Sequence, residues 1–152
     1  MTAPRVTLVI DEPKWKKPAL LTARLKRAAS AALKKAGKKS DGTLTILLAD
    51  DARLRELNTR FRGKKKPTNV LSFPAQDASY LGDVAIAWGV TAREARESGK
   101  SFSDHASHLV VHGVLHLLGY DHEADKDAKI MESLEVKILK TLRVADPYRV
   151  RA

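Results

Sequence analysis

The chain has 152 residues, of which 43% are hydrophobic and 30% are charged, and it contains no cysteine. This length and composition predict one soluble domain over 1–152, and the absence of cysteine excludes disulfides and thiolate metal ligands. The net charge of +10 is unevenly divided, because residues 1–76 carry 18 Lys and Arg against 6 Asp and Glu, whereas residues 77–152 carry 10 against 12. Such a basic half is typical of nucleic-acid-binding proteins, although a soluble protein without such a partner can also be basic.

The apolar residues of the first half predict two strands and two helices. Alternation predicts a strand over 6–10, and a buried apolar run predicts another over 44–49. A helix with a lysine-rich outer face is expected from Pro18 to Gly37, and a second from Asp50 or Asp51 through Phe61. The apolar run at the start is too short for a signal peptide or a membrane span, so we expect a cytoplasmic protein with no membrane partner.

The second half reads as two strands followed by helices. Strands are predicted over 69–73 and 81–88, with a connection short enough for a hairpin. Helices are expected near 91–97 and from about Asp104. A last amphipathic helix is predicted to place on its apolar face Ile130, Leu134, Ile138 and Leu142.

The most informative motif is a group of three histidines near the end of the helix that follows Asp104. His112 and His116 are four residues apart, so they lie on one face of a helix. Gly119 supplies a break after them, because glycine accepts the left-handed conformation that ends helices. The chain can then turn back and bring His122 towards the first two, which makes a metal site on a helix and the turn that follows it.

Three imidazole ligands favour Zn²⁺, and a site with three protein ligands leaves a fourth position open, as catalytic zinc sites do. The spacing is that of the metzincin peptidases, with Gly113 in place of the glutamate that acts there as general base. The alternative is that the histidines pack or cap without metal. His108 and His105 fall on the same helical face, one and two turns before His112. We expect them either to support the site or to be surface residues.

A second motif is a basic loop between the second predicted helix and the third predicted strand. Its charges suit an RNA backbone, because arginine pairs with two phosphate oxygens and lysine supplies a movable charge. Phe61 and Phe73, on either side of the loop, stack bases or pack in the core, and the loop itself can also be no more than solvated surface. The five candidate RNA-binding residues are Arg60, Arg62, Lys64, Lys65 and Lys66.

Together these segments closely resemble the YbeY family of bacterial endoribonucleases, which are also called rRNA maturation factors. The resemblance spans nearly the whole chain, and the histidine motif is its most specific part. Its further segments include Leu57-Asn58, Phe61-Arg62, the run from Lys66 to Pro74, Leu81-Gly82-Asp83, His108-Leu109, Met131-Glu132 and Glu135. It implies an α+β fold with a mixed four-stranded sheet packed with about five helices.

The resemblance also implies a function and site residues. It implies a single-strand-specific, metal-dependent endoribonuclease that acts on ribosomal RNA precursors of the small subunit, at the 3′ end of the 16S RNA, and in ribosome quality control. One Zn²⁺ per chain, with no organic cofactor, would be held by His112, His116 and His122. Arg62 and His112 are the expected catalytic residues. Many family members carry Asp where this chain has Asn69.

The general base and the nucleophile stay open at this point. Asp121, next to the third histidine, is expected to act either as a base or as a residue that supports the site by hydrogen bonding. Two other functions also stay open. One is a metzincin-like peptidase, and the other is an accessory factor that binds RNA or the ribosome around a mainly structural zinc ion.

Overall fold

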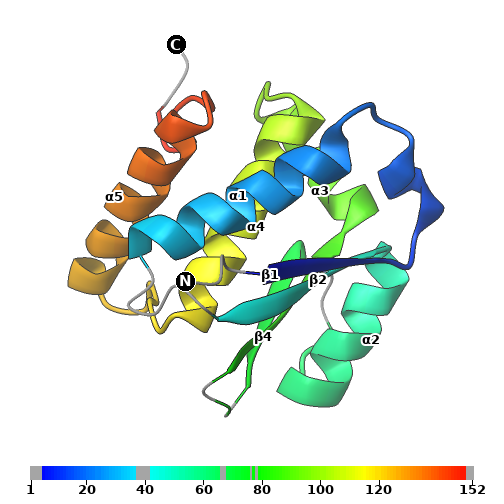
Figure 1. Ribbon diagram of the computed structural model, residues 1–152. Helices are drawn as coiled ribbons and strands as arrows, with labels where there is room; N and C mark the ends of the chain where they lie inside the picture. The colour runs from blue at the N-terminus through cyan, green and yellow to red at the C-terminus, as the bar shows by residue number, and fades with distance from the viewer. Residues whose placement is uncertain (1–4, 37–41, 66–67, 76, 78, 150–152) are drawn as a thin grey trace.

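The computed structural model describes residues 5–36, 42–65, 68–75, 77 and 79–149 (Figure 1). These residues form four strands, five α-helices and one short 3-10 helix, which confirms the predicted α+β class. None of the helices formed by these residues is long and apolar enough to cross a membrane. The predicted helix end at Gly37 and the predicted RNA-binding residue Lys66 lie outside the described residues.

The four strands form one mixed sheet in the order β1-β2-β4-β3. Its central pairs are parallel, β1 with β2 and β2 with β4, whereas β3 runs antiparallel to β4 as the predicted hairpin requires. Each predicted strand agrees with an observed one to within a residue at either end. Their bounds are Arg5–Ile10 for β1, Thr43–Ala49 for β2, Val70–Pro74 for β3 and Tyr80–Ala87 for β4.

The helices cover the sheet unequally. On one face of the sheet lie α1 (Leu21–Ala36) and α4 (Phe102–Leu117), and α5 (Asp125–Thr141) packs on these two helices (Figure 1). This side holds the larger core, into which β2 sends every second residue, namely Leu44, Ile46 and Leu48. The opposite face carries α2 (Asp51–Arg62) and a smaller apolar cluster.

The first helix begins three residues later than the sequence predicted. Pro13–Lys16 forms the short 3-10 helix, and Leu20 then adopts a left-handed φ of 64°, which no helix residue has, so α1 starts at Leu21. The 3-10 helix buries Trp15, whose indole Nε1 donates a hydrogen bond to the Ala49 carbonyl at 2.9 Å. That long-range contact was not visible in the local pattern.

Both candidate capping aspartates are used, but on different helices. Asp50 accepts a hydrogen bond from the Arg53 amide at 2.8 Å and caps α2. Asp51 accepts one from the Val90 amide at 2.9 Å, in the first turn of α3 (Trp88–Glu97), three residues before the predicted start of that helix. A Cβ on Gly89 would lie 2.4 Å from the Asp51 carboxylate, so this close approach requires glycine.

The prediction of which residues form the buried face of the last helix is partly wrong. Ile130 is 47% exposed, and Leu134 and Leu142 are only partly buried. The buried stripe of α5 consists of Met131, Glu135, Ile138 and Leu139. The sequence pattern favoured the other stripe because a glutamate occupies one of the core positions of the true one, and an ionised side chain is expected to face solvent unless it is paired.

Gly113 allows α4 to lie close against the sheet. A Cβ at this position would meet Val84 Cγ1 at 2.6 Å and Cγ2 at 3.2 Å, and the Gly113 carbonyl accepts a hydrogen bond from Ser72 Oγ at 2.9 Å. We expect Gly113→Ala to lower the free energy of unfolding by about 1–2 kcal/mol, because overpacking costs about 1–3 kcal/mol and the gain in helix propensity returns about 1. Urea unfolding of the purified protein measures this.

The control is the double variant Gly113→Ala/Val84→Ala, in which the obstructing methyl groups are gone. Its loss of stability should be smaller than the sum of the two single losses, because the residues are in direct contact. Additive losses, or a stabilising Gly113→Ala, would show that the helix does not depend on this close approach.

Candidate metal centre

The three histidines of the motif come together where α4 ends. His112 and His116 lie on α4, and a Schellman motif stops the helix: Gly119 has a φ of 98°, and its amide and that of Tyr120 bond back to the carbonyls of His116 and Leu115. The chain turns and brings His122 back. The ring centroids of the three histidines lie 4.7–5.4 Å apart, and one ring nitrogen of each lies within 4.8 Å of the others.

The environment keeps His116 neutral. Burial lowers its pKa, and neighbouring His112 and His122 lower it further, to about 4. A neutral imidazole offers a lone pair to a cation, which is the form that binds metal. His112 is half-buried and His122 is exposed, so one side of the group opens to solvent.

Glu135 of α5 lies behind the histidine group and is fully buried. Its Oε1 accepts hydrogen bonds from His108 Nε2 at 2.5 Å and from the Tyr148 hydroxyl at 2.6 Å, and its Oε2 accepts one from His112 Nδ1 at 3.0 Å. Burial raises the pKa of this carboxyl, but the hydrogen bonds from His108, His112 and Tyr148 outweigh it and hold the pKa at about 2. Glu135 is therefore an ionised carboxylate.

This carboxylate sets the tautomer of His112. Since an ionised carboxylate only accepts hydrogen bonds, His112 donates from Nδ1, and the neutral tautomer that does so has its lone pair on Nε2. A carboxylate that orients a histidine in this way is the usual support of a zinc ligand. The donor set of three imidazole nitrogens, one of them oriented by Glu135, fits a zinc ion.

Glu135 was missed as a site residue in the sequence. The available signal was its position, four residues after Met131 and three before Ile138, on the buried face of α5. A carboxylate at a core position needs buried donors, and the histidines of another helix are the donors at hand. Reading that signal required the correct face of the helix.

The two earlier histidines do not join the group of three. His108 Nε2 bonds Glu135 instead, so His108 supports the carboxylate that His112 also contacts. His105 is 8% exposed, and its Nε2 lies 2.9 Å from Glu94 Oε1. Burial lowers the pKa of His105, and hydrogen bonding to Glu94 opposes this shift.

The histidine group and part of the basic loop line one cavity of about 570 Å³. Arg62, the last residue of α2, and Lys64 line it, and β3 supplies Val70, Ser72 and Pro74. Gly63 between them has a φ of 66° and ends α2 in a left-handed cap. The remaining lining residues are Thr68, Asn69, His112, His116, Asp121, His122 and Glu123.

The other loop residues are placed differently. Arg60 pairs with Glu56 at 3.5 Å and lines a separate cavity beside α2. Lys65 is exposed and is not among the residues that line the histidine cavity. Phe61 is 60% exposed and rests edge-on against Phe73, with ring centroids 5.4 Å apart. The prediction that Phe61 packs in the core is therefore wrong.

Two polar residues of the cavity have partners that hold the backbone around it. Asp121 Oδ1 accepts a hydrogen bond from the Glu123 amide at 3.3 Å, within the turn that carries His122. Asn69 Nδ2 donates to Glu94 Oε1 at 3.0 Å, the oxygen that His105 also contacts. An aspartate in place of Asn69 would bring a second carboxylate next to that of Glu94, and the two negative charges would repel each other. In this chain the amide of Asn69 instead donates a hydrogen bond to Glu94.

Known proteins match the chain over most of its length. The sequence model of the family described as "Endoribonuclease YbeY" matches residues 10–143, which include Arg62, the three histidines and Glu135. The chain belongs to the YbeY family. The protein named "Endoribonuclease YbeY" from Chelativorans sp. is 47% identical over 88% of this chain and 86% of its own. The protein of the same name from Cereibacter sphaeroides is 45% identical over 95% of this chain and 99% of its own.

The fold agrees with a solved structure as well. The solution structure of TM1509 from Thermotoga maritima has 26% sequence identity, a TM-score of 0.61, and a match over 96% of this chain and 99% of that one. In this structure, position 113 faces β3 and β4, because a Cβ there would meet Val84 and Ser72. A glutamate could not replace Gly113 there without displacing the sheet, which argues against the metzincin-like peptidase.

Proposed function

We propose that this protein is a metal-dependent endoribonuclease that cuts single-stranded RNA at the cavity between α4 and the basic loop. The observation that carries the proposal is the cavity shared by Arg62 of α2, His112 and His116 of α4, and His122 of the turn after α4. Zn²⁺, one per chain, is the metal we assign to the three histidines, because they supply only nitrogen ligands. Family membership supports RNA as the substrate.

The chain's own residues divide the work of the reaction. Arg62 and Lys64 bind the phosphate backbone, and the rigid guanidinium of Arg62 steadies the extra negative charge that develops on the phosphorus oxygens. Glu135 holds His112 in the tautomer that presents Nε2. When bound, zinc supplies Lewis-acid polarisation of a phosphoryl oxygen or a water of lowered pKa.

The same assignment places the protein in ribosomal RNA maturation. We infer that it acts in the cytoplasm on precursors of the small-subunit RNA, at the 3′ end of the 16S RNA, and in ribosome quality control. The name shared by its relatives supports RNA cleavage, the basic first half of the chain suits an RNA partner, and the ribosomal target is what the family resemblance implies. RNA binding stays a prediction for all five candidate residues, of which Arg62 and Lys64 line the histidine cavity and Arg60, Lys65 and Lys66 do not stand among its described lining residues.

The test is cleavage of a labelled single-stranded RNA by the protein as isolated, after chelator treatment, and after zinc is restored. We expect cleavage to be lost with the chelator and to return with zinc, and a duplex of the same sequence to stay intact. Magnesium and manganese, added to separate chelated samples, show whether another metal serves. RNA that stays intact in every arm, while it still binds in a salt-dependent manner, would favour an RNA-binding accessory factor with a structural zinc.

A further inference from the structure

The last described residues, 144–149, return to the back of the metal centre. After α5 the chain forms a Schellman motif, in which Arg143 has a left-handed φ of 61°, its amide bonds the Lys140 carbonyl, and the Val144 amide bonds the Leu139 carbonyl. Val144 is buried in the main core. The chain therefore reverses at a defined point, and the segment that follows runs towards α4.

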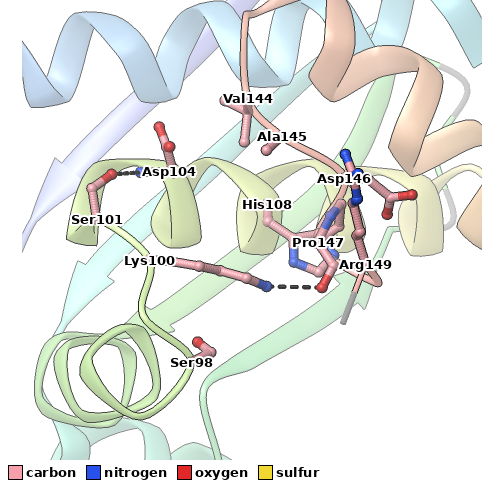
Figure 2. Close-up of a pocket in the computed structure, with 10 residues that line it drawn as sticks. All are labelled: Ser98, Lys100, Ser101, Asp104, His108, Val144, Ala145, Asp146, Pro147 and Arg149. Carbon is pink, nitrogen blue, oxygen red and sulfur yellow. Dashed lines mark hydrogen bonds between the residues drawn. The ribbon is translucent and has the colours of Figure 1, made fainter. Parts of the chain in front are cut away.

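A cavity of about 740 Å³ lies between this segment, the connection that follows α3, and the first turns of α4. Figure 2 shows His108 projecting from α4 towards the segment, and Lys100 Nζ donating to the Pro147 carbonyl at 2.9 Å. Asp146 Oδ1 also accepts a hydrogen bond from the Tyr148 amide at 2.8 Å. The side chains of Ala145, Asp146 and Arg149 are exposed, so the hydrogen bond from Lys100 ties the segment to the fold where these side chains do not pack, and the Asp146 bond shapes the segment locally.

Tyr148 reaches from this segment into the network around Glu135. Its hydroxyl donates to Glu135 Oε1 at 2.6 Å, and its ring packs edge-on against His108, with centroids 5.5 Å apart. The ring is 43% exposed, so burial of apolar area is not its main contribution. The hydroxyl, in contrast, meets the one buried carboxylate that also bonds His112.

We propose that Tyr148 is a positioning residue of the metal centre. Its hydroxyl and His108 Nε2, which lie 3.4 Å from each other, both donate to Glu135 Oε1, which restricts rotation of the carboxylate and so aims Oε2 at His112 Nδ1. His112 in turn presents Nε2. The family match ends at residue 143, so Tyr148 lies beyond the matched part of the chain. This inference rests on the proposed zinc site.

The test is zinc affinity, measured by competition with a chromophoric chelator, in the parent protein, Tyr148→Phe and a matched control, Tyr80→Phe. The control loses a hydroxyl that bonds Thr45 and Asp83, two residues that line a different cavity beside α2. We expect Tyr148→Phe to bind zinc about three- to tenfold more weakly. Glu135→Gln sets the scale with a loss of about ten- to a hundredfold, as is typical for direct partners of a ligand. Tyr80→Phe should bind like the parent.

The visible spectrum of the cobalt-substituted protein gives a second readout, because it reports how the ligands are arranged. We expect the Tyr148→Phe spectrum to shift in the direction of Glu135→Gln and that of Tyr80→Phe to match the parent. Parent-like affinity and spectrum in Tyr148→Phe would overturn the inference, whatever its melting temperature. If His116→Ala binds zinc as tightly as the parent, the metal centre itself is wrong, and the proposed function falls with it.

Discussion

Replacing His116 with alanine is expected to abolish both zinc retention and RNA cleavage. His116 is the central member of the group, with its ring 4.7 Å from that of His112 and 5.3 Å from that of His122. Two imidazoles cannot make a three-ligand site, and a metal contributes several kcal/mol of transition-state stabilisation. Cleavage should therefore fall by about a thousandfold or more. Zinc content after dialysis and the rate of cleavage of a labelled RNA measure the two losses.

Thermal unfolding shows whether zinc binds the folded chain. A ligand that binds only the folded state raises the melting temperature of the protein, and the more so at higher ligand concentration. Added zinc should therefore stabilise the parent protein but not His116→Ala. His105→Gln is the control on the same helix, since His105 pairs with Glu94 outside the histidine group. It should retain one zinc per chain. A variant His116→Ala that is still stabilised by zinc would place the ligands elsewhere.

Replacing Arg62 with alanine is expected to lower kcat by about a hundred- to a thousandfold while zinc binding stays unchanged. Arg62 lines the histidine cavity but belongs to α2, so its loss removes a cation from the proposed RNA site without touching the three histidines. The magnitude is that seen when one preorganised group that stabilises developing negative charge is removed. Single-turnover cleavage and zinc content, measured on the same preparation, separate the two effects.

Arg53→Ala is the matched control for Arg62→Ala. Arg53 also lies on α2, but it pairs with Glu56 at 3.1 Å and lines the other cavity. The control variant loses the same charge from the same helix, so any general effect of charge on RNA binding appears in both variants. Equal rates for the two variants would mean that Arg62 contributes only to the overall field and not to the reaction.

The sequence predicted the four strands because their signals are local. Alternating apolar residues predicted β1, and an apolar run predicted β2. The bounds of both observed strands agree with the predicted bounds to within a residue. The turn chemistry of Gly119 was equally visible, since the helix that carries His112 and His116 needs a left-handed backbone where it ends. The family resemblance added that the four strands form one mixed sheet, whereas the strand order β1-β2-β4-β3 was seen only in the structure.

The candidate site was visible in part. The four-residue spacing of His112 and His116, with Gly119 before His122, predicted a cluster that the structure contains. The basic loop was predicted as a unit, yet of its described residues only Arg62 and Lys64 line the histidine cavity. Helix α2 decides this, because successive residues point in different directions around a helix and Arg60 is directed towards Glu56.

By itself, the sequence determined the groups that can bind a metal and where the helix that carries them stops, because a helix places residues four apart on one face whatever surrounds it. Only the tertiary structure decided which groups support them. Glu135 follows His112 by 23 residues and Tyr148 follows His108 by 40, and such contacts depend on how α5 and the segment after it pack on α4. A buried carboxylate is stable only where folding brings donors to it, so its role could be recognised only from the packed structure.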